Sequence, residues 1–254
     1  MKNIVIDCHC HLGSYFNFYV PGPTPEDMIR SMDITGTDQA CICPHMCLSS
    51  DIVRGNGFMI DTVKKYPGRF IGLFTYNPHF PELMKDELDT AFRVRGVMGI
   101  KIHQGTHKTN LLNPAYRYLY DFAERYRLPV LIHTWAVQTI NEIEEVSAEY
   151  PHARFIMGHF GATPENMKKA ASVVNSRKNV YGDTTVSMMY EGNIEWLCEL
   201  VGAKRILFGT DMPFYDARPN IGRIYAADIS EADRTHILGI NMKNILEDTR
   251  EYEG

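Results

Sequence analysis

The sequence predicts an α/β protein, a single (β/α)8 barrel of the TIM type that spans residues 1–254. Three observations lead to this fold class. Eight apolar runs of strand length recur along the whole chain, amphipathic segments with helix-start signals lie between them, and about 250 residues is the usual size of such a barrel. No segment is low in complexity or has the composition of a linker. The eight repeated units therefore leave little room for a second domain.

The predicted strands begin 25 to 35 residues apart and are almost uniformly apolar. Such runs are typical of parallel strands that are covered on both faces. In chain order the runs are Ile4–Cys10, Gln39–Cys43, Phe70–Tyr76, Val97–His103, Pro129–Thr134, Arg154–His159, Asn179–Thr184 and Arg205–Asp211.

Helix starts are marked between these runs. Thr24, Asn113 and Thr163 each offer a capping side chain directly before a proline, the residue favoured at the first helical position. Ser230 begins a last helix in the manner of a capping box, with Asp233 in place of the usual glutamate. Aromatic and aliphatic residues recur at spacings of three and four from Ala115 to Arg125, which predicts another helix.

The composition excludes several classes of protein. With 44% hydrophobic and 22% charged residues, the chain is typical of a globular enzyme and not of a disordered or fibrous protein. Its net charge of −5 argues against binding to nucleic acid or to an acidic membrane. No apolar run approaches the roughly 20 residues of a membrane span, and Asp7 interrupts the first apolar run, so we expect no secretion signal and a cytoplasmic location.

Two cysteine pairs lie in predicted strands, Cys8 with Cys10 and Cys41 with Cys43. Their spacing differs from the C-x-x-C turn of structural zinc sites. We therefore expect free, buried thiols on the faces of the strands that pack against the helices.

Polar residues collect at the carboxyl ends of the predicted strands, where barrel enzymes place their active sites. The first strand ends in His9 and His11, which share one face. Five of the ten histidines lie at such ends, and random placement explains this poorly. These histidines are His9, His11, His103, His133 and His159, and Lys101 and Asp211 also lie at strand ends. Imidazole nitrogens with a carboxylate oxygen suit Zn²⁺, Mn²⁺ or Fe²⁺ in a catalytic site.

These pieces resemble the amidohydrolase superfamily, above all its amidohydrolase-2 branch, which also contains aminocarboxymuconate-semialdehyde decarboxylase. The resemblance runs from Ile4 to Leu246. It is carried in order by the segments Asp7–His11, Gly99–His103, Pro129–His133, Gly158–Gly161 and Leu207–Phe214. It implies a distorted barrel with a metal at its mouth.

The resemblance also implies a ligand set of His9, His11, His133 and Asp211 around the metal. One ion, most readily Zn²⁺, is favoured over two. His159 corresponds to the catalytic histidine of one-metal members, and in two-metal members it ligates the second ion. Asp211 is the expected proton carrier.

Three further residues are predicted to contact the substrate. Lys101 corresponds to a lysine that some two-metal relatives carbamylate, but we favour an ordinary ammonium that binds a substrate carboxylate. His103 either bonds to the substrate or caps its strand, and Trp135 lines the site. The remaining histidines are predicted to be structural or at the surface: His45, His79, His107, His152 and His236.

The main functional prediction is a metal-dependent hydrolase that uses a metal-activated water on a small amide, lactone or other ester-like bond. The alternative is a metal-dependent, non-oxidative decarboxylase of an aromatic or enoic acid. A TatD-type deoxyribonuclease is less favoured, because that family carries an acidic residue where this chain has Lys101. A catalytically silent scaffold is a further reading. We expect a small-molecule substrate and leave open whether identical chains associate.

Overall fold

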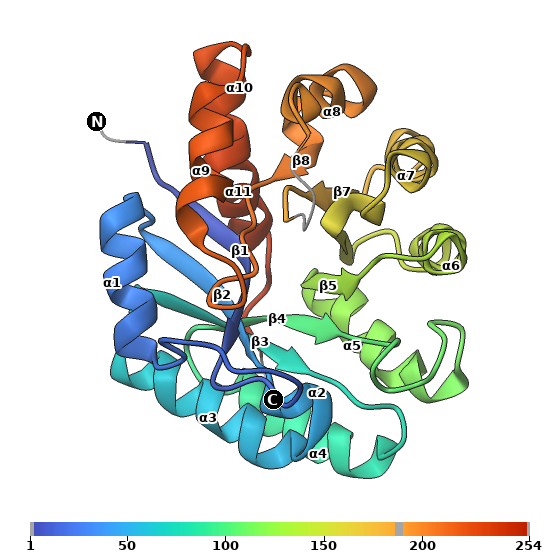
Figure 1. Cartoon of the computed structure of the whole chain (residues 1–254). Helices are drawn as coiled ribbons and strands as arrows, with labels where there is room; N and C mark the ends of the chain where they lie inside the picture. The colour runs from blue at the N-terminus through green and yellow to red at the C-terminus, as the bar shows by residue number, and fades with distance from the viewer. Residues whose placement is uncertain (1–2, 186–189, 253–254) are drawn as a thin grey trace.

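The computed structural model describes residues 3–185 and 190–252, and it places eight parallel strands in one sheet in the order β1 to β8 (Figure 1). This confirms the predicted (β/α)8 barrel. The strands are β1 Ile6–Leu12, β2 Gln39–Pro44, β3 Phe70–Thr75, β4 Val97–Ile102, β5 Pro129–His133, β6 Arg154–Gly158, β7 Val180–Asp183 and β8 Ile206–Leu207.

The barrel is closed between its first strand and the segment that follows its last strand. The Cys8 amide donates to the Phe208 carbonyl at 2.8 Å, and the Asp211 amide donates to the His9 carbonyl at 2.8 Å. The His11 amide adds a third bond, 2.7 Å long, to the Met212 carbonyl. Our eighth strand was predicted to reach Asp211, but the ladder ends at Leu207. Beyond Leu207, individual hydrogen bonds to β1 replace the strand ladder, and Asp211 turns towards the barrel mouth.

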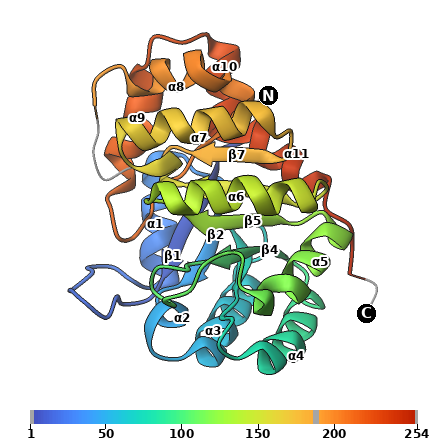
Figure 2. The same ribbon diagram turned by 90° about the vertical axis from the view of Figure 1, so that its right-hand side faces the viewer.

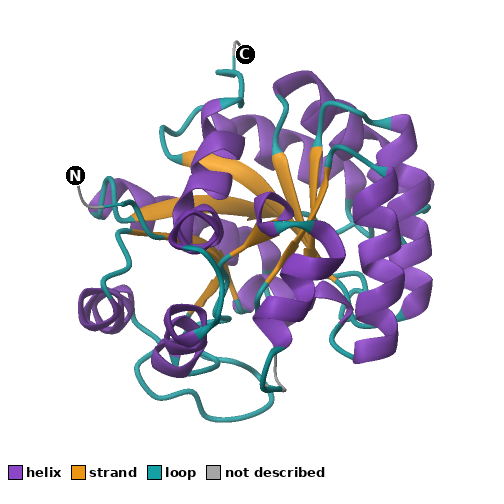
Figure 3. Ribbon diagram, turned by 90° about the horizontal axis from the view of Figure 1, so that it is seen from above, coloured by secondary structure: helices purple, strands orange, loops and turns teal. Residues whose placement is uncertain are grey.

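Helices surround the sheet (Figures 2 and 3), and the predicted capping residues begin them as expected. Thr24 forms a complete capping box with Asp27, and Thr163 and Ser230 accept from the amides three residues on. The α-helices are α1 Pro25–Thr35, α2 Met46–Ser49, α3 Ile52–Lys65, α4 Pro81–Phe92, α5 Arg117–Tyr126, α6 Val137–Glu149, α7 Pro164–Ser176, α8 Asn193–Val201, α9 Ala217–Ala226, α10 Glu231–Thr235 and α11 Asn241–Glu247.

Shorter helical turns complete the chain. Asn113 caps the 3₁₀ turn η1 Pro114–Tyr116, which precedes α5, so the helix predicted from Ala115 is split in two. The other turns are η2 His159–Gly161, η3 Ala203–Arg205 and the π-helical η4 His236–Ile240. Within the described ranges, no helix combines the length and the apolar character needed to cross a bilayer.

The apolar core has two parts. Val130 and Ile132 of β5 belong to the part that includes helix residues such as Ile143, whereas Leu131 between them belongs to the other. Because side chains of a strand alternate between its faces, this second part lies inside the barrel, on the face that also carries His133.

Our prediction for the paired cysteines is correct about burial and wrong about direction for three of the four. Cys8, Cys41 and Cys43 pack in the part of the core inside the barrel, and only Cys10 packs towards the helices. A register shift between Asp7 and Cys10 breaks the simple alternation of β1. In β2 both faces of the strand are buried from Ala40 to Pro44. No alternation of polar and apolar residues in the sequence therefore indicates which face points into the barrel.

Candidate active site at the barrel mouth

The predicted strand-end residues converge on one cavity of about 170 Å³ at the barrel mouth. Six of the residues that we predicted line it: His11, His103, His133, Trp135, His159 and Asp211. Five other residues line it as well: Tyr15, His45, Leu48, Phe214 and Tyr215.

His9, His11 and Asp211 form a compact group of possible metal ligands. One ligand atom from each lies within 4.8 Å of the other two. The Asp211 Oδ1 atom is 2.9 Å from His11 Nε2 and 3.5 Å from His9 Nε2. All three residues are buried. Two imidazoles and one carboxylate are a donor set that Zn²⁺, Mn²⁺ and Fe²⁺ accept, so these residues fit a divalent ion.

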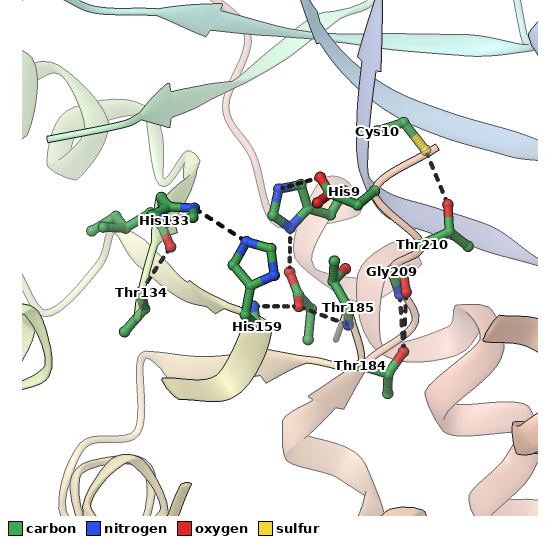
Figure 4. Close-up of polar contacts among 12 residues, drawn as sticks. His9, Cys10, His133, Thr134, His159, Thr184, Thr185, Gly209 and Thr210 are labelled. Carbon is green, nitrogen blue, oxygen red and sulfur yellow. Dashed lines mark hydrogen bonds and ion pairs between the residues drawn. The ribbon is translucent and has the colours of Figure 1, made fainter. Parts of the chain in front are cut away.

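His133, the fourth predicted ligand, lies beside this group. Its Nδ1 atom is 3.1 Å from His159 Nε2 (Figure 4), and its ring stacks on that of His103 with centroids 4.0 Å apart. Among the described residues, the ligand atoms that lie within 4.8 Å of one another belong to His9, His11 and Asp211 and not to His133. Its ligand role therefore stays a prediction.

The second ring nitrogen of each histidine in the group has a partner of its own. His9 Nδ1 lies 2.8 Å from Asp183 Oδ2, and His11 Nδ1 lies 3.3 Å from the Cys43 thiol. Such partners fix the tautomer and the orientation of a ligating imidazole. We had assigned no role to Asp183, although its place at the end of β7 was a signal, because carboxylates at barrel strand ends are candidates for the site.

Asp183 connects three strand ends. Its Oδ1 atom accepts from the amides of His159 at 2.8 Å and Thr185 at 3.0 Å, while its Oδ2 atom faces His9. Burial raises the pKa of Asp183 to about 7, against the lowering effect of the amides.

Asp7 forms a similar buried junction but does not contact an imidazole. It accepts from the Thr210 hydroxyl at 2.6 Å and from the amides of Thr210 and His9 at 3.1 Å. Burial raises its pKa to about 7 as well. Asp7 therefore holds the backbone of β1 and of the segment before Asp211 in place.

Lys101 lies behind the ligand group with its side chain fully buried, and it is not among the residues that line the cavity. Its Nζ atom is 2.7 Å from His9 Nε2. An ammonium group only donates, so His9 Nε2 accepts this bond and Nδ1 carries the proton that is donated to Asp183. His9 Nε2 thus accepts from Lys101, and Asp211 Oδ1 lies 3.5 Å from the same nitrogen.

Burial favours the neutral form of the histidines of the site. Burial lowers the pKa of His9 to about 3, with the charge of Lys101 as a second cause. Burial also lowers the pKa values of His11, His133 and His159 well below the usual range. Neutral imidazoles offer the lone pairs that a metal or a substrate proton requires.

The backbone is strained at His159, directly after β6, and at Asp211, in the segment that follows β8. Both have positive φ angles, 64° and 65°, a conformation that costs a residue other than glycine roughly 1–2 kcal/mol. Hydrogen bonds hold both turns: the His159 amide donates to Asp183, and the Asp211 amide to the His9 carbonyl. Strain held in this way is common at functional sites.

Two predicted substrate contacts have distinct environments. Trp135 is 45% exposed and stacks on His133 with centroids 5.9 Å apart, so it lies at the rim of the cavity. His103 Nδ1 accepts from the Thr106 hydroxyl at 2.9 Å and from the Thr106 amide at 3.3 Å, so its Nε2 atom carries the proton.

His45 was predicted to be structural or at the surface, and the structure places it buried beside the cavity. It directly follows β2, is 1% exposed, and lines the cavity with its ring parallel to that of His11. Tyr15 also lines the cavity, in edge contact with His45 and Phe214. A single histidine after a strand gave no sequence signal, because its partners come from another loop.

Comparison with known proteins identifies the family. The family model described as amidohydrolase, Amidohydro_2, matches residues 6–242, and the chain belongs to this family. A curated relative, the gamma-resorcylate decarboxylase of Polaromonas sp. strain JS666, is 24% identical over 248 residues, which cover 76% of this chain and 75% of the relative.

Solved structures share the fold. The 5-carboxyvanillate decarboxylase from Sphingomonas paucimobilis has a TM-score of 0.78 at 15% identity and covers 97% of this chain and 99% of its own. A dihydroxybenzoic acid decarboxylase from Polaromonas sp. JS666, solved with manganese and 2-nitroresorcinol, has a TM-score of 0.78 at 20% identity and covers 97% of both chains.

These comparisons overturn our main functional prediction. We expected hydrolysis with decarboxylation as the alternative, but the curated relative and both of these structural neighbours are decarboxylases. The Polaromonas structure contains manganese, whereas we had named zinc as the first choice of metal.

Proposed function

We propose that this amidohydrolase-family protein is a metal-dependent, non-oxidative decarboxylase of a small aromatic acid. One observation carries the proposal: His11 and Asp211 of the ligand group line a cavity walled by aromatic rings, and the third member, His9, contacts the buried Lys101 ammonium behind it. A cation site beside an ammonium suits a carboxylate, and the ring walls suit a planar ring. The decarboxylase relatives support the same reading.

The size of the cavity limits the substrate. An engineered protein cavity of about 150 Å³ holds one benzene molecule, and the cavity here measures about 170 Å³. A single ring with small substituents matches this volume. We therefore propose a monocyclic aromatic acid. The cytoplasmic location and any association of identical chains stay predictions.

The residues fit one divalent ion, and we propose that His9, His11 and Asp211 hold it, with His133 as a fourth ligand. Manganese is our first choice because structural neighbours contain it, with Zn²⁺ and Fe²⁺ as alternatives. When bound, such an ion acts as a Lewis acid that polarises the substrate carboxylate or a neighbouring oxygen.

Decarboxylation breaks the bond between the ring carbon and the carboxyl carbon and leaves the electron pair on the ring. Carbon dioxide departs, and the ring carbon needs one proton. We assign this transfer to Asp211, whose carboxyl lines the cavity and would take the proton up from solvent water before passing it to the ring carbon. Lys101 orients the carboxylate by its charge, and neutral His159 orients the substrate by hydrogen bonding.

The test compares two reactions on one preparation. Manganese-loaded protein is incubated with a panel of hydroxybenzoic acids and, separately, with a panel of lactones and amides. A chelator-treated sample serves as control. We expect carbon dioxide and the decarboxylated ring compound from at least one acid, and only with metal. Hydrolysis without carbon dioxide release from any acid would reject the proposal.

Metal content gives a second, independent check. Protein purified without chelators should contain about one equivalent of Mn²⁺ or Zn²⁺ by elemental analysis. Consistent absence of metal, together with an activity that added ions do not change, would contradict the proposed site.

A further inference from the structure

His45 offers the cavity a hydrogen-bond acceptor whose orientation is fixed by the fold. It follows β2 directly, and its ring lies parallel to that of His11, with centroids 4.6 Å apart and an interplanar angle of 11°. Its amide donates to the Leu12 carbonyl at 2.8 Å, which ties this part of the chain to the end of β1.

The position of the ring proton follows from the contact of His45 Nδ1. This atom lies 2.9 Å from the carbonyl oxygen of Gly13. A carbonyl oxygen only accepts, so Nδ1 carries the hydrogen and donates it, and Nε2 of the neutral ring is left with a lone pair. Gly13 is itself held in place, because its amide donates to the Pro23 carbonyl at 3.0 Å.

The lone pair on His45 Nε2 has no donor within the described part of the chain, although the atom is buried. Around the ring, Tyr15 and Phe214 contribute aromatic faces and edges. The charged groups nearby are Asp211 and Lys101. A buried acceptor without a donor is costly, so a ligand that brings a donor to this position gains binding energy.

We propose that His45 Nε2 accepts a hydrogen bond from a hydroxyl group on the substrate ring and thereby selects hydroxylated over methoxylated or unsubstituted aromatic acids. This inference rests on the proposed function, because it assumes an aromatic acid in the same cavity. The acceptor discriminates because a methyl ether has no proton to donate and places a methyl group against a buried lone pair.

The test is a binding cycle with matched ligands. Dissociation constants of the manganese-loaded protein are measured by calorimetry for dihydroxybenzoic acids and for their mono-methyl ethers, each hydroxyl in turn. We expect at least one hydroxyl whose methylation weakens binding about tenfold or more. In His45→Phe, which keeps an aromatic ring against His11, the effect of methylating that hydroxyl should fall to about twofold or less.

A matched control is His79→Phe. The His79 Nε2 atom also donates to a backbone carbonyl, that of His107, and its side chain is not part of the cavity lining. This variant should keep the full preference for the hydroxylated ligand. An equal loss of preference in both variants would reject the role of His45.

A measurement on the unaltered protein covers the case in which His45→Phe fails to fold. In the Zn²⁺-loaded protein, which is diamagnetic, the ¹⁵N resonance of His45 Nε2 should have the position of an unprotonated nitrogen. It should move in the direction of hydrogen-bond acceptance with the hydroxylated acid and stay in place with its methyl ether.

The outcomes separate the two proposals. If aromatic acids bind but no hydroxyl couples to His45, this inference fails and the proposed function stands. If no aromatic acid binds at all, both fail together.

Discussion

The carboxylate of Asp183 holds the imidazole of His9, with 2.8 Å between Oδ2 and Nδ1 and both side chains fully buried. The other oxygen of the same carboxylate binds the amide of His159. One residue at the end of β7 therefore orients a predicted metal ligand from β1 and a predicted catalytic residue from β6. This contact determines which nitrogen of His9 faces the site.

Asp183→Asn should weaken metal binding. An amide has one oxygen, so it cannot accept both from His9 and from the backbone amides on its other side. Loss of such a partner typically costs about 10- to 100-fold in metal affinity. Competition with a chelator of known affinity measures the change. Asp7→Asn is the matched control, because that buried carboxylate accepts from the backbone and from Thr210 but from no imidazole. An equal loss in both variants would attribute the effect to general destabilisation.

Asp211→Asn should abolish turnover while the fold stays intact. The amide cannot carry the proton that the ring carbon needs, and a positioned acid typically contributes about 10²- to 10⁴-fold to the rate. Because Asp211 is also a proposed ligand, the rate of carbon dioxide release is compared at saturating metal, with occupancy verified by elemental analysis. A metal-loaded variant with a rate near that of the unaltered protein would show that Asp211 is not the proton carrier.

Lys101→Met should change two affinities differently. Binding of aromatic carboxylates should weaken by about tenfold or more, because a hydrogen bond to a charged group is lost. Metal affinity should stay equal or rise, because the ammonium 2.7 Å from His9 Nε2 no longer competes for that lone pair. Both are measured on one preparation, by ligand titration and by metal competition. A loss of metal affinity, with a fall from two bound ions to one, would instead indicate a carbamylated lysine that bridges two ions.

Acid should destabilise the protein partly through His107. Burial lowers the pKa of this histidine, whose Nε2 atom donates to the Cys47 carbonyl. A lowered pKa in the folded state means that stability is complete above the unfolded-state value of 6.5 and is lost as the pH falls below it. Urea unfolding of chelator-treated protein at pH 7.5 and 5.5 should show a smaller loss for His107→Gln.

The size of this effect is bounded, because one proton changes the free energy of unfolding by at most about 1.4 kcal/mol for each pH unit. His152→Gln serves as the control, since the His152 side chain is 60% exposed. If His107→Gln and the unaltered protein lose the same stability on acidification, burial of His107 does not contribute.

Periodicity and capping residues were enough to predict most of the fold. Uniformly apolar runs with regular spacing identified all eight strands, because a parallel strand must be apolar on both of its faces. Thr24, Thr163 and Ser230 marked helix starts because the interaction that caps a helix is local. The end of the last strand was wrong, since its hydrogen bonds depend on β1, about 200 residues earlier in the chain.

Within the site, the sequence predicted which residues lie at the barrel mouth but not how they pair. His9, His11 and Asp211 were predicted together from their strand ends, and they do meet. The contact of His133 with His159, the stacking of His45 on His11 and the inward direction of Cys43 were not predicted. Each depends on the direction in which side chains from separate strands or loops point.

The sequence by itself determined the barrel, the family resemblance and the edge of the sheet at which the site lies. All three follow from local sequence patterns, which do not depend on contacts between distant residues. Only the tertiary structure decided that Asp183 holds His9, that Lys101 donates to His9 Nε2, and that His45 lines the cavity. These contacts join residues about 30 to 170 positions apart, and hydrogen-bond geometry at such separations is set by strand register and backbone turns, which no spacing in the sequence records.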